Sequence, residues 1–104
     1  MVQSPTVVVV ATLDTKGVDA AFVRDLILEK GLATLLVDVG VLGDITVTPD
    51  IGREEIAEYA GTTLAELIDT KDKGLTITTQ SAGLVALVQD LYDQGRLTGI
   101  IGLG

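Results

Sequence analysis

The 104-residue sequence contains no cysteine and no histidine, and each absence removes whole classes of chemistry. Without cysteine there are no disulfides, thiolate zinc sites, iron–sulfur clusters or thiol nucleophiles. Without histidine there is no imidazole base for Ser-His-Asp catalysis, and the commonest transition-metal ligand is missing. Carboxylates, hydroxyls, a few lysines and backbone amides are the remaining chemical groups. No catalytic constellation is evident among them.

Aromatic residues make up only 3% of the chain, and 15 acidic residues against 7 basic ones give a formal net charge of −8. This charge repels phosphate backbones, and so few rings provide no stacking platform for single-stranded nucleic acid. The longest apolar run, Val7–Ala11, is far shorter than the ~20 residues of a membrane-spanning helix. Met1–Gln3 lacks the cationic start of a signal peptide. We therefore expect a cytoplasmic protein with no nucleic-acid and no membrane partner.

Three apolar runs predict strands that are buried on both faces. Thr6–Thr12 is rich in β-branched residues without polar alternation, which is typical of a parallel sheet covered on both sides. Thr34–Val39 and the shorter, glycine-rich Gly99–Leu103 have the same character. The length corresponds to one domain, so residues 1–104 are taken as a single unit.

Between the first two strands, Gly17–Lys30 predicts a helix that ends before a C-cap glycine, Gly31. The residues at helical spacing are Val18, Ala21, Phe22, Leu26 and Glu29. A helix between two apolar strands favours a right-handed parallel crossover, so helices are expected on both faces of the sheet. We predict an α/β fold: a three-layer Rossmann-like domain whose short parallel sheet has the strand order second, first, third.

The middle of the chain predicts a turn-rich excursion followed by helices. Residues 41–52 are dense in glycine, proline and aspartate and predict a path across the top of the sheet. Arg53–Ala60 is expected to be a short helix, and Thr63–Glu66 matches a capping box that opens another one. The helical face expected in Leu75–Gln94 consists of Ile77, Leu84, Val88, Leu91 and Tyr92. By propensity Leu75–Thr79 alone could be a strand, but the 3.6-residue period that continues beyond it favours a helix.

The turn after the first strand is the first candidate site, because it precedes a predicted helix N-terminus, where free amides favour an anion. Lys16 would supply a point charge to a phosphate, Thr12 and Thr15 hydroxyl groups, Asp14 a magnesium or water contact, and Gly17 close backbone approach. The structural alternative is that these residues cap the helix, form the turn and face solvent. The turn matches neither the phosphate-loop motif nor the dinucleotide fingerprint.

Two further loops are expected at the same edge of the sheet. Asp38 ends the second strand, near the position where dinucleotide-binding folds place a ribose-binding carboxylate, and Gly40 follows it. The structural alternative for Asp38 is a hydrogen bond to neighbouring loop amides, with Gly40 forming the turn. After the third strand, Gly102 and Gly104 predict the start of a glycine-containing loop.

Four segments, in order and spacing, carry a resemblance to a known family: Thr12-Leu-Asp-Thr-Lys-Gly17, Leu36-Val-Asp-Val-Gly40 with Leu42-Gly43, Pro49-Asp-Ile-Gly-Arg-Glu-Glu55, and Gly99-Ile-Ile-Gly-Leu-Gly104. They resemble the tobamovirus-resistance-protein-like ATP-binding family over nearly the whole chain. The resemblance implies a Rossmann-like N-terminal half-domain of a longer, two-domain protein. It also implies that the 14–17 turn, Asp38, Gly40, Gly102 and Gly104 belong to an ATP pocket. We therefore expect this sequence to be a fragment that does not include the family's last glycine-rich loop and its C-terminal domain.

These observations lead to two principal hypotheses from different classes. The first is a nucleotide-binding fragment that holds the phosphates of ATP, with Mg²⁺ as a further ligand, at Asp14–Gly17. The second is a protein-interaction module whose acidic surface and 41–52 excursion face a partner, with nucleotide incidental. A fragment without activity of its own is a third option. An unpaired edge of a truncated sheet further predicts a homo-oligomer.

Overall fold

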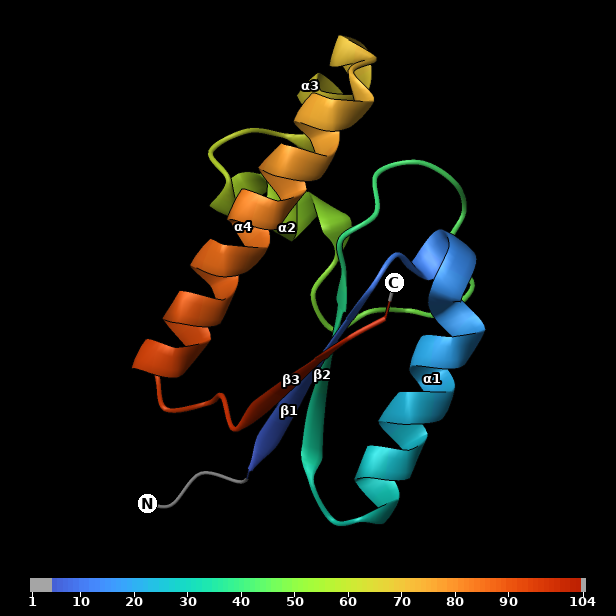
Figure 1. Cartoon of the computed structure of the whole chain (residues 1–104), viewed down its shortest axis with the longest axis vertical. Coiled ribbons are helices and arrows are strands. Elements are labelled where there is room, and N and C mark those ends of the chain that lie inside the picture. The colour runs from blue at the N-terminus through green and yellow to red at the C-terminus, as the bar shows by residue number, and fades with distance from the viewer. Residues whose placement is uncertain (1–4, 104) are drawn as a thin grey trace.

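A computed structural model of the chain describes residues 5–103 and shows an α/β fold of three layers (Figure 1). Its strands are β1 (Thr6–Ala11), β2 (Ala33–Asp38) and β3 (Gly99–Gly102), and its helices are α1 (Leu13–Glu29), α2 (Arg53–Tyr59), α3 (Leu64–Thr70) and α4 (Lys73–Asp93). The three strands are parallel and lie in the order β2-β1-β3. Both the fold class and the strand order predicted from the sequence are confirmed.

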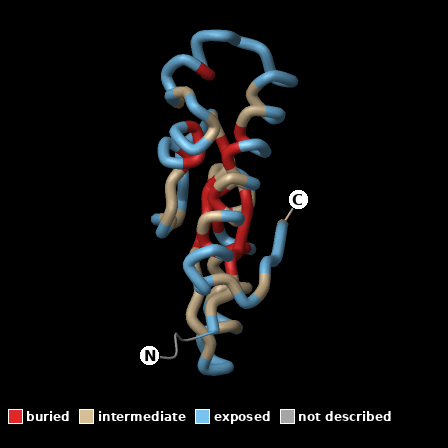
Figure 2. The backbone as a smooth tube through the Cα atoms, turned by 90° about the vertical axis from the view of Figure 1, so that its left-hand side faces the viewer, coloured by how far each residue is buried: buried red, intermediate tan, exposed pale blue. Residues whose placement is uncertain are grey.

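The central strand β1 is buried on both faces, as its uninterrupted β-branched run predicts (Figure 2). The same prediction was wrong for β3, where Ile100 and Ile101 are 49% and 38% exposed. Val8 and Val10 face a core cluster that includes α2 and α4. Val9 and Ala11 face the opposite cluster, to which α1 contributes. Because successive side chains of a strand point to opposite sides, one apolar run supplies both cores. Figure 1 shows the two helical layers that result, with α3 beyond the carboxyl ends of the strands.

Helix α1 begins at Leu13, so the expected loop at 12–17 is in fact the N-cap and first turn of the helix. Thr12 is the extended N-cap residue. The amide of Leu13 donates to Asp38 Oδ1 over 3.2 Å, and this buried carboxylate satisfies the first helical N–H. The earlier start could not be read locally, because the group that stabilises it comes from the end of another strand.

The face of α1 expected to be buried is the exposed one, which corrects the sequence prediction. Val18 is 75% exposed and Phe22 64% exposed. The sheet instead contacts the positions Leu13, Ala20, Val23 and Ile27, with Gly17 buried beside them. The helix has two apolar stripes, and the one with small residues packs on the sheet because it permits the closer approach.

Residues 39–52 cross the carboxyl end of the sheet, as expected, and then return along the outer edge of β2. The amide of Asp38 donates to the carbonyl of Ile51, and those of Asp50 and Ile51 donate to the carbonyl of Leu36. Asp50 Oδ2 also accepts from the Leu36 amide over 2.7 Å. Gly17 makes room for this segment, since a Cβ there would collide with Thr46 Oγ1. The return segment therefore covers the β2 edge.

The helices after residue 52 follow the predicted boundaries closely. Thr63 caps α3 by accepting from the Glu66 amide, which is the N-cap half of the expected capping box. Residues 75–79 are helical, which resolves the ambiguity in favour of the 3.6-residue period. Helix α4 approaches α2 at Gly83, where a Cβ would collide with the Ile56 carbonyl oxygen. This contact explains why a glycine lies inside a long helix.

The predicted apolar face of α4 is correct at its centre and wrong at both ends. Leu84, Val88 and Leu91 are at least half-buried, and Leu84 and Leu91 belong to the core. Ile77 and Tyr92 are 62% and 67% exposed and lie outside the core clusters. None of the helices in the described part of the chain has the length and apolar character needed to cross a membrane.

Candidate functional site

The carboxylate of Asp38 is the polar centre at the end of β2 and is almost completely buried. Its Oδ1 accepts from the amides of Leu13 and Gly40, at 3.2 and 2.9 Å, and its Oδ2 accepts from Arg53 Nε at 2.7 Å. These contacts are those of the structural alternative, in which Asp38 holds loop amides. Both carboxylate oxygens are therefore already engaged within the protein.

Arg53, which sequence reasoning did not single out, connects three parts of this edge. Besides the ion pair with Asp38, its Nη1 donates to the carbonyls of Leu42 and Gly43, at 3.1 and 3.2 Å. Its Nη2 lies 3.8 Å from Asp14 Oδ1 in the first turn of α1. No local signal identifies this residue, because a cation in the first turn of a helix lies at the less favourable end of the helix dipole. Its partners come from distant segments of the chain.

Gln80 connects helix α4 to this network. Its Nε2 donates to the carbonyls of Gly40 and Arg53, at 3.1 and 3.3 Å. Within residues 5–103, three buried side-chain atoms of this cluster have no hydrogen-bond partner: Asp14 Oδ1, Arg53 Nη2 and Gln80 Oε1. Buried polar atoms are normally paired, so the concentration of three exceptions around Gly40 distinguishes this region from the rest of the core.

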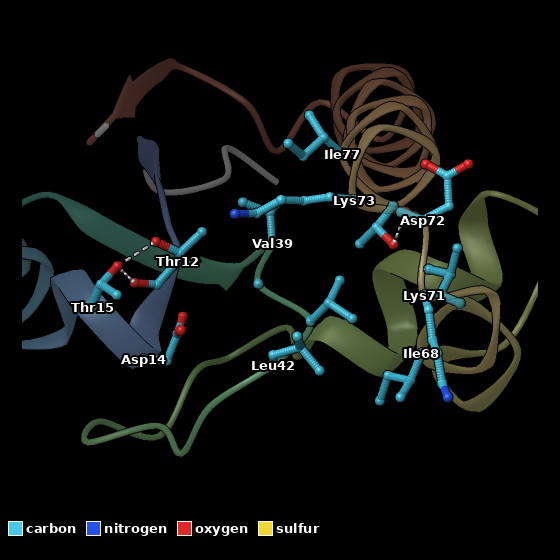
Figure 3. A pocket seen from close by; sticks show the side chains of 14 residues that line it. Thr12, Asp14, Thr15, Val39, Leu42, Ile68, Lys71, Asp72, Lys73 and Ile77 are labelled. Atoms are coloured by element: carbon cyan, nitrogen blue, oxygen red, sulfur yellow. Dashed lines mark hydrogen bonds between the residues drawn. The ribbon is translucent and has the colours of Figure 1, made fainter.

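A cleft of about 620 Å³ opens beside this network, between the start of α1 and the α3–α4 connection (Figure 3). Of the residues proposed from the sequence, Thr12, Asp14, Thr15 and Gly40 line it. The remaining lining residues are Val39, Val41, Leu42, Leu67, Ile68, Lys71, Asp72, Lys73, Thr76 and Ile77. The structure therefore brings together the first two predicted loops at one site, and adds walls that the sequence did not indicate.

Several proposed site residues lie elsewhere. Lys16, Gly17, Asp38 and Gly102 do not line the cleft, and Gly104 lies outside the described residues. Gly17 packs against the 39–52 segment, and Asp38 is enclosed by its hydrogen bonds. Because the helix starts at Leu13, Lys16 lies in its first turn rather than in a loop.

The polar end of the cleft lies at the carboxyl end of β1. The hydroxyls of Thr12 and Thr15 are 2.8 Å apart, and the amides of Thr15 and Lys16 bond to the Thr12 carbonyl. In Figure 3 the Lys73 side chain extends across the cleft towards Thr12, whereas Lys71 points away beside Ile68. Helix α4 thus supplies a lysine, Lys73, whose side chain points to the polar end of the cleft.

Two acidic side chains, Asp14 and Asp72, line the cleft. Across residues 5–103, no group of three or more histidine, cysteine, aspartate or glutamate side chains is arranged to hold one. The Arg53 guanidinium near Asp14 also disfavours a cation at that carboxylate. Outside the cleft, Tyr59 donates to Asp90 over 2.7 Å. This bond raises the pKa of Tyr59 and lowers that of Asp90.

Fold and cleft together define a Rossmann-like α/β domain with a ligand-sized hollow at the carboxyl end of its parallel strands. Residues 5–104 match the N-terminal domain of the uncharacterised protein family UPF0261. The chain belongs to this family.

Curated relatives support the same assignment. A UPF0261 protein of Clostridium tetani is 37% identical over 94% of this chain, and one of Brucella suis is 35% identical over 97% of it. A relative from Mesorhizobium japonicum is 32% identical over 92% of the chain. The chain spans 24% of the length of each of these proteins. No solved structure matches the chain.

Proposed function

We propose that this domain binds a nucleotide, and ATP in particular, in the cleft at the carboxyl end of β1 and β2. The observation that carries the proposal is the cleft itself: an apolar hollow with two hydroxyls and a lysine at one end. In open parallel sheets, ligands bind outside the carboxyl ends of the strands where the strand order reverses. Here β1 is that point, because β2 and β3 lie on either side of it.

The dimensions and lining of the cleft suit a nucleoside. Its volume of about 620 Å³ lies within the roughly 300–1,000 Å³ typical of small-molecule sites. Most of the wall is aliphatic, formed by Val41, Leu42, Leu67, Ile68 and Ile77. Such a wall offers an apolar surface to a base, while the few convergent polar groups fix its orientation.

The phosphates would lie at the polar end, close to Thr12, Thr15 and Lys73. Lysine acts on phosphate as a mobile point charge, and hydroxyls donate to its oxygens. The proposal differs here from the expectation based on the sequence, since Lys73 replaces Lys16 as the cation. The amides of Thr15 and Lys16 already have an acceptor, so the side chains are the main anion contacts.

ATP is preferred among nucleotides because of the sequence resemblance to the tobamovirus-resistance-protein-like ATP-binding family. Magnesium enters the proposal as the ion that accompanies the triphosphate. Mg²⁺ is commonly held by one or two carboxylates plus substrate phosphates, and a site of this kind needs no dedicated protein cage.

The test is a calorimetric titration of Mg²⁺–ATP into the wild type, Lys73→Ala and Lys16→Ala. Charge-assisted contacts contribute about 1.5–3 kcal/mol, so Lys73→Ala should weaken binding by roughly 10-fold or more. Lys16→Ala is the matched control, because it removes the same charge outside the cleft, and its affinity should stay within about 2-fold of the wild type. Absence of binding by the wild type, or a larger loss for Lys16→Ala, would contradict the proposal.

An interaction role is the second candidate, and the exposed side chains of the 39–52 segment favour it. Leu42 is 66% exposed and Ile45 43% exposed, with the acidic Asp44 between them. Substitutions at residues 44–49 that abolish binding of a partner, while Lys73→Ala leaves it unchanged, would favour this role over nucleotide binding.

A further inference from the structure

The space directly above the Cα atom of Gly40 is bounded by three charged side chains. A Cβ atom placed on Gly40 would lie 2.8 Å from Arg53 Nη2 and 3.1 Å from an oxygen of both Asp14 and Asp38. Gly40 is not among the described glycines with positive φ, so the backbone conformation does not require a glycine here. The need for this residue lies in the space that it leaves.

Two of the three surrounding atoms are available for a new hydrogen bond. Arg53 Nη2 and Asp14 Oδ1 are buried and 3.8 Å apart, and neither has a hydrogen-bond partner in the described part of the chain. The Arg53 side chain is only 8% exposed. Asp38 Oδ1, in contrast, already accepts two amides. The space thus presents one unpaired donor and one unpaired acceptor at a separation that a single atom can bridge.

We propose that Asp14, Gly40 and Arg53 form a subsite for a hydroxyl group of the ligand, which is a ribose hydroxyl if the ligand is a nucleotide; this deepens the proposed function and rests on it. A hydroxyl donates one hydrogen bond and accepts others, so it can donate to Asp14 Oδ1 and accept from Arg53 Nη2. A phosphate oxygen is repelled by the two carboxylates, and a metal cation by the guanidinium. A neutral hydroxyl can form a hydrogen bond with both the carboxylate and the guanidinium.

The subsite adjoins the cleft, because Asp14 and Gly40 line it, whereas Arg53 does not. The subsite is also close in sequence to the polar end of the cleft, because Asp14 lies between Thr12 and Thr15 in the chain. Hydrogen bonds shielded from water are stronger than exposed ones, so the subsite can discriminate between ligands that differ by one hydroxyl.

The experiment compares ATP with 2′,3′-dideoxy-ATP by calorimetry. The wild type should bind ATP about 10-fold more tightly, as expected when charged buried partners lose their hydroxyl. Gly40→Ala places a methyl group in the subsite and should abolish this preference. Gly99→Ala is the matched control, because a Cβ there meets nothing within 4 Å and Gly99 has no positive φ. It should keep the wild-type preference.

Asp14→Asn provides a second variant of unchanged size, which should reduce the preference by removing the charged acceptor. It decides the question if circular dichroism shows that Gly40→Ala does not fold. Equal binding of the two nucleotides by the wild type would overturn the subsite and leave the proposed function standing. An undiminished preference in folded Gly40→Ala or in Asp14→Asn would also overturn it. Binding of neither nucleotide would overturn the subsite and the proposed function together.

Discussion

The two outer edges of the sheet differ in how they are finished. At the β2 edge, the backbone of the strand bonds to Asp50 and Ile51. The last residue of the strand, Asp38, is paired with Arg53. At the β3 edge, Ile100 and Ile101 are 49% and 38% exposed, and the ladder to β1 is the pairing that the structure describes. The candidate site lies on the side where backbone and side chains are fixed by polar contacts from several elements.

This difference indicates that the β2 side of the sheet is suited to a binding site and the β3 side to association. Convergent polar contacts from α1, α2, α4 and the 39–52 segment hold the β2 side in a single arrangement, which a binding site needs. The β3 side carries no charged residue or proline between Gly99 and Leu103 to discourage pairing with another strand. It is therefore the side where we expect association with further polypeptide.

Arg53→Met is the substitution expected to destabilise the β2 side most. This change leaves the buried Asp38 carboxylate without its cation, so the free energy of unfolding should fall by about 3–5 kcal/mol, as measured by urea denaturation. Adding Asp38→Asn should restore part of the stability, because a neutral side-chain oxygen still accepts the amides of Leu13 and Gly40. A loss below about 1 kcal/mol, or no recovery in the double variant, would show that the pair does not stabilise this edge.

Asp50→Ala tests how the return segment stabilises the β2 edge, and its expected effect on stability is smaller. Asp50→Ala leaves the buried Leu36 amide without its acceptor, so the free energy of unfolding should fall by about 1–2 kcal/mol. Asp44→Ala, an exposed acid in the same segment, is the control and should change stability by less than about 0.5 kcal/mol. Equal denaturation midpoints for both variants would argue against a role of the Asp50 carboxylate.

The β3 side should be the least sensitive in stability and the most sensitive in association. Ile100→Lys places a charge on the half-exposed strand and should cost less than about 1 kcal/mol. It should also abolish self-association in sedimentation velocity, because charged edge strands resist pairing. A wild type that stays monomeric at high micromolar concentration would refute the predicted homo-oligomer, and an unchanged oligomer in Ile100→Lys would place its interface elsewhere.

Local patterns were sufficient for most of the fold. The β-branched run of β1 predicted burial on both faces, and the turn-rich 41–52 segment predicted an excursion over the sheet. The buried faces of the helices were harder to predict from the sequence. Helix α1 has two apolar stripes, and local spacing cannot decide which one contacts the sheet. The stripe with Gly17 and Ala20 packs inward because small residues let the helix approach, and that depends on its partner surface.

The candidate site was predictable only in part. Thr12, Asp14, Thr15 and Gly40 were identified from their place after strands, and the structure brings them to one cleft. Arg53, Gln80 and Lys73 were missed because their roles arise from contacts with residues distant in the chain. The predicted contribution of Lys16 depended on a loop that is in fact helical.

The order of apolar runs and turn residues by itself determined an α/β domain with strand order β2-β1-β3 and loops converging at the carboxyl edge. Right-handed crossovers leave few other arrangements for such a pattern. Only the tertiary structure decided which charges meet around Gly40, and that Lys71 and Lys73 rather than Lys16 line the cleft. Hydrophobic periodicity is a local property, whereas the pairing of buried charges depends on distances between segments that become neighbours only when the chain folds.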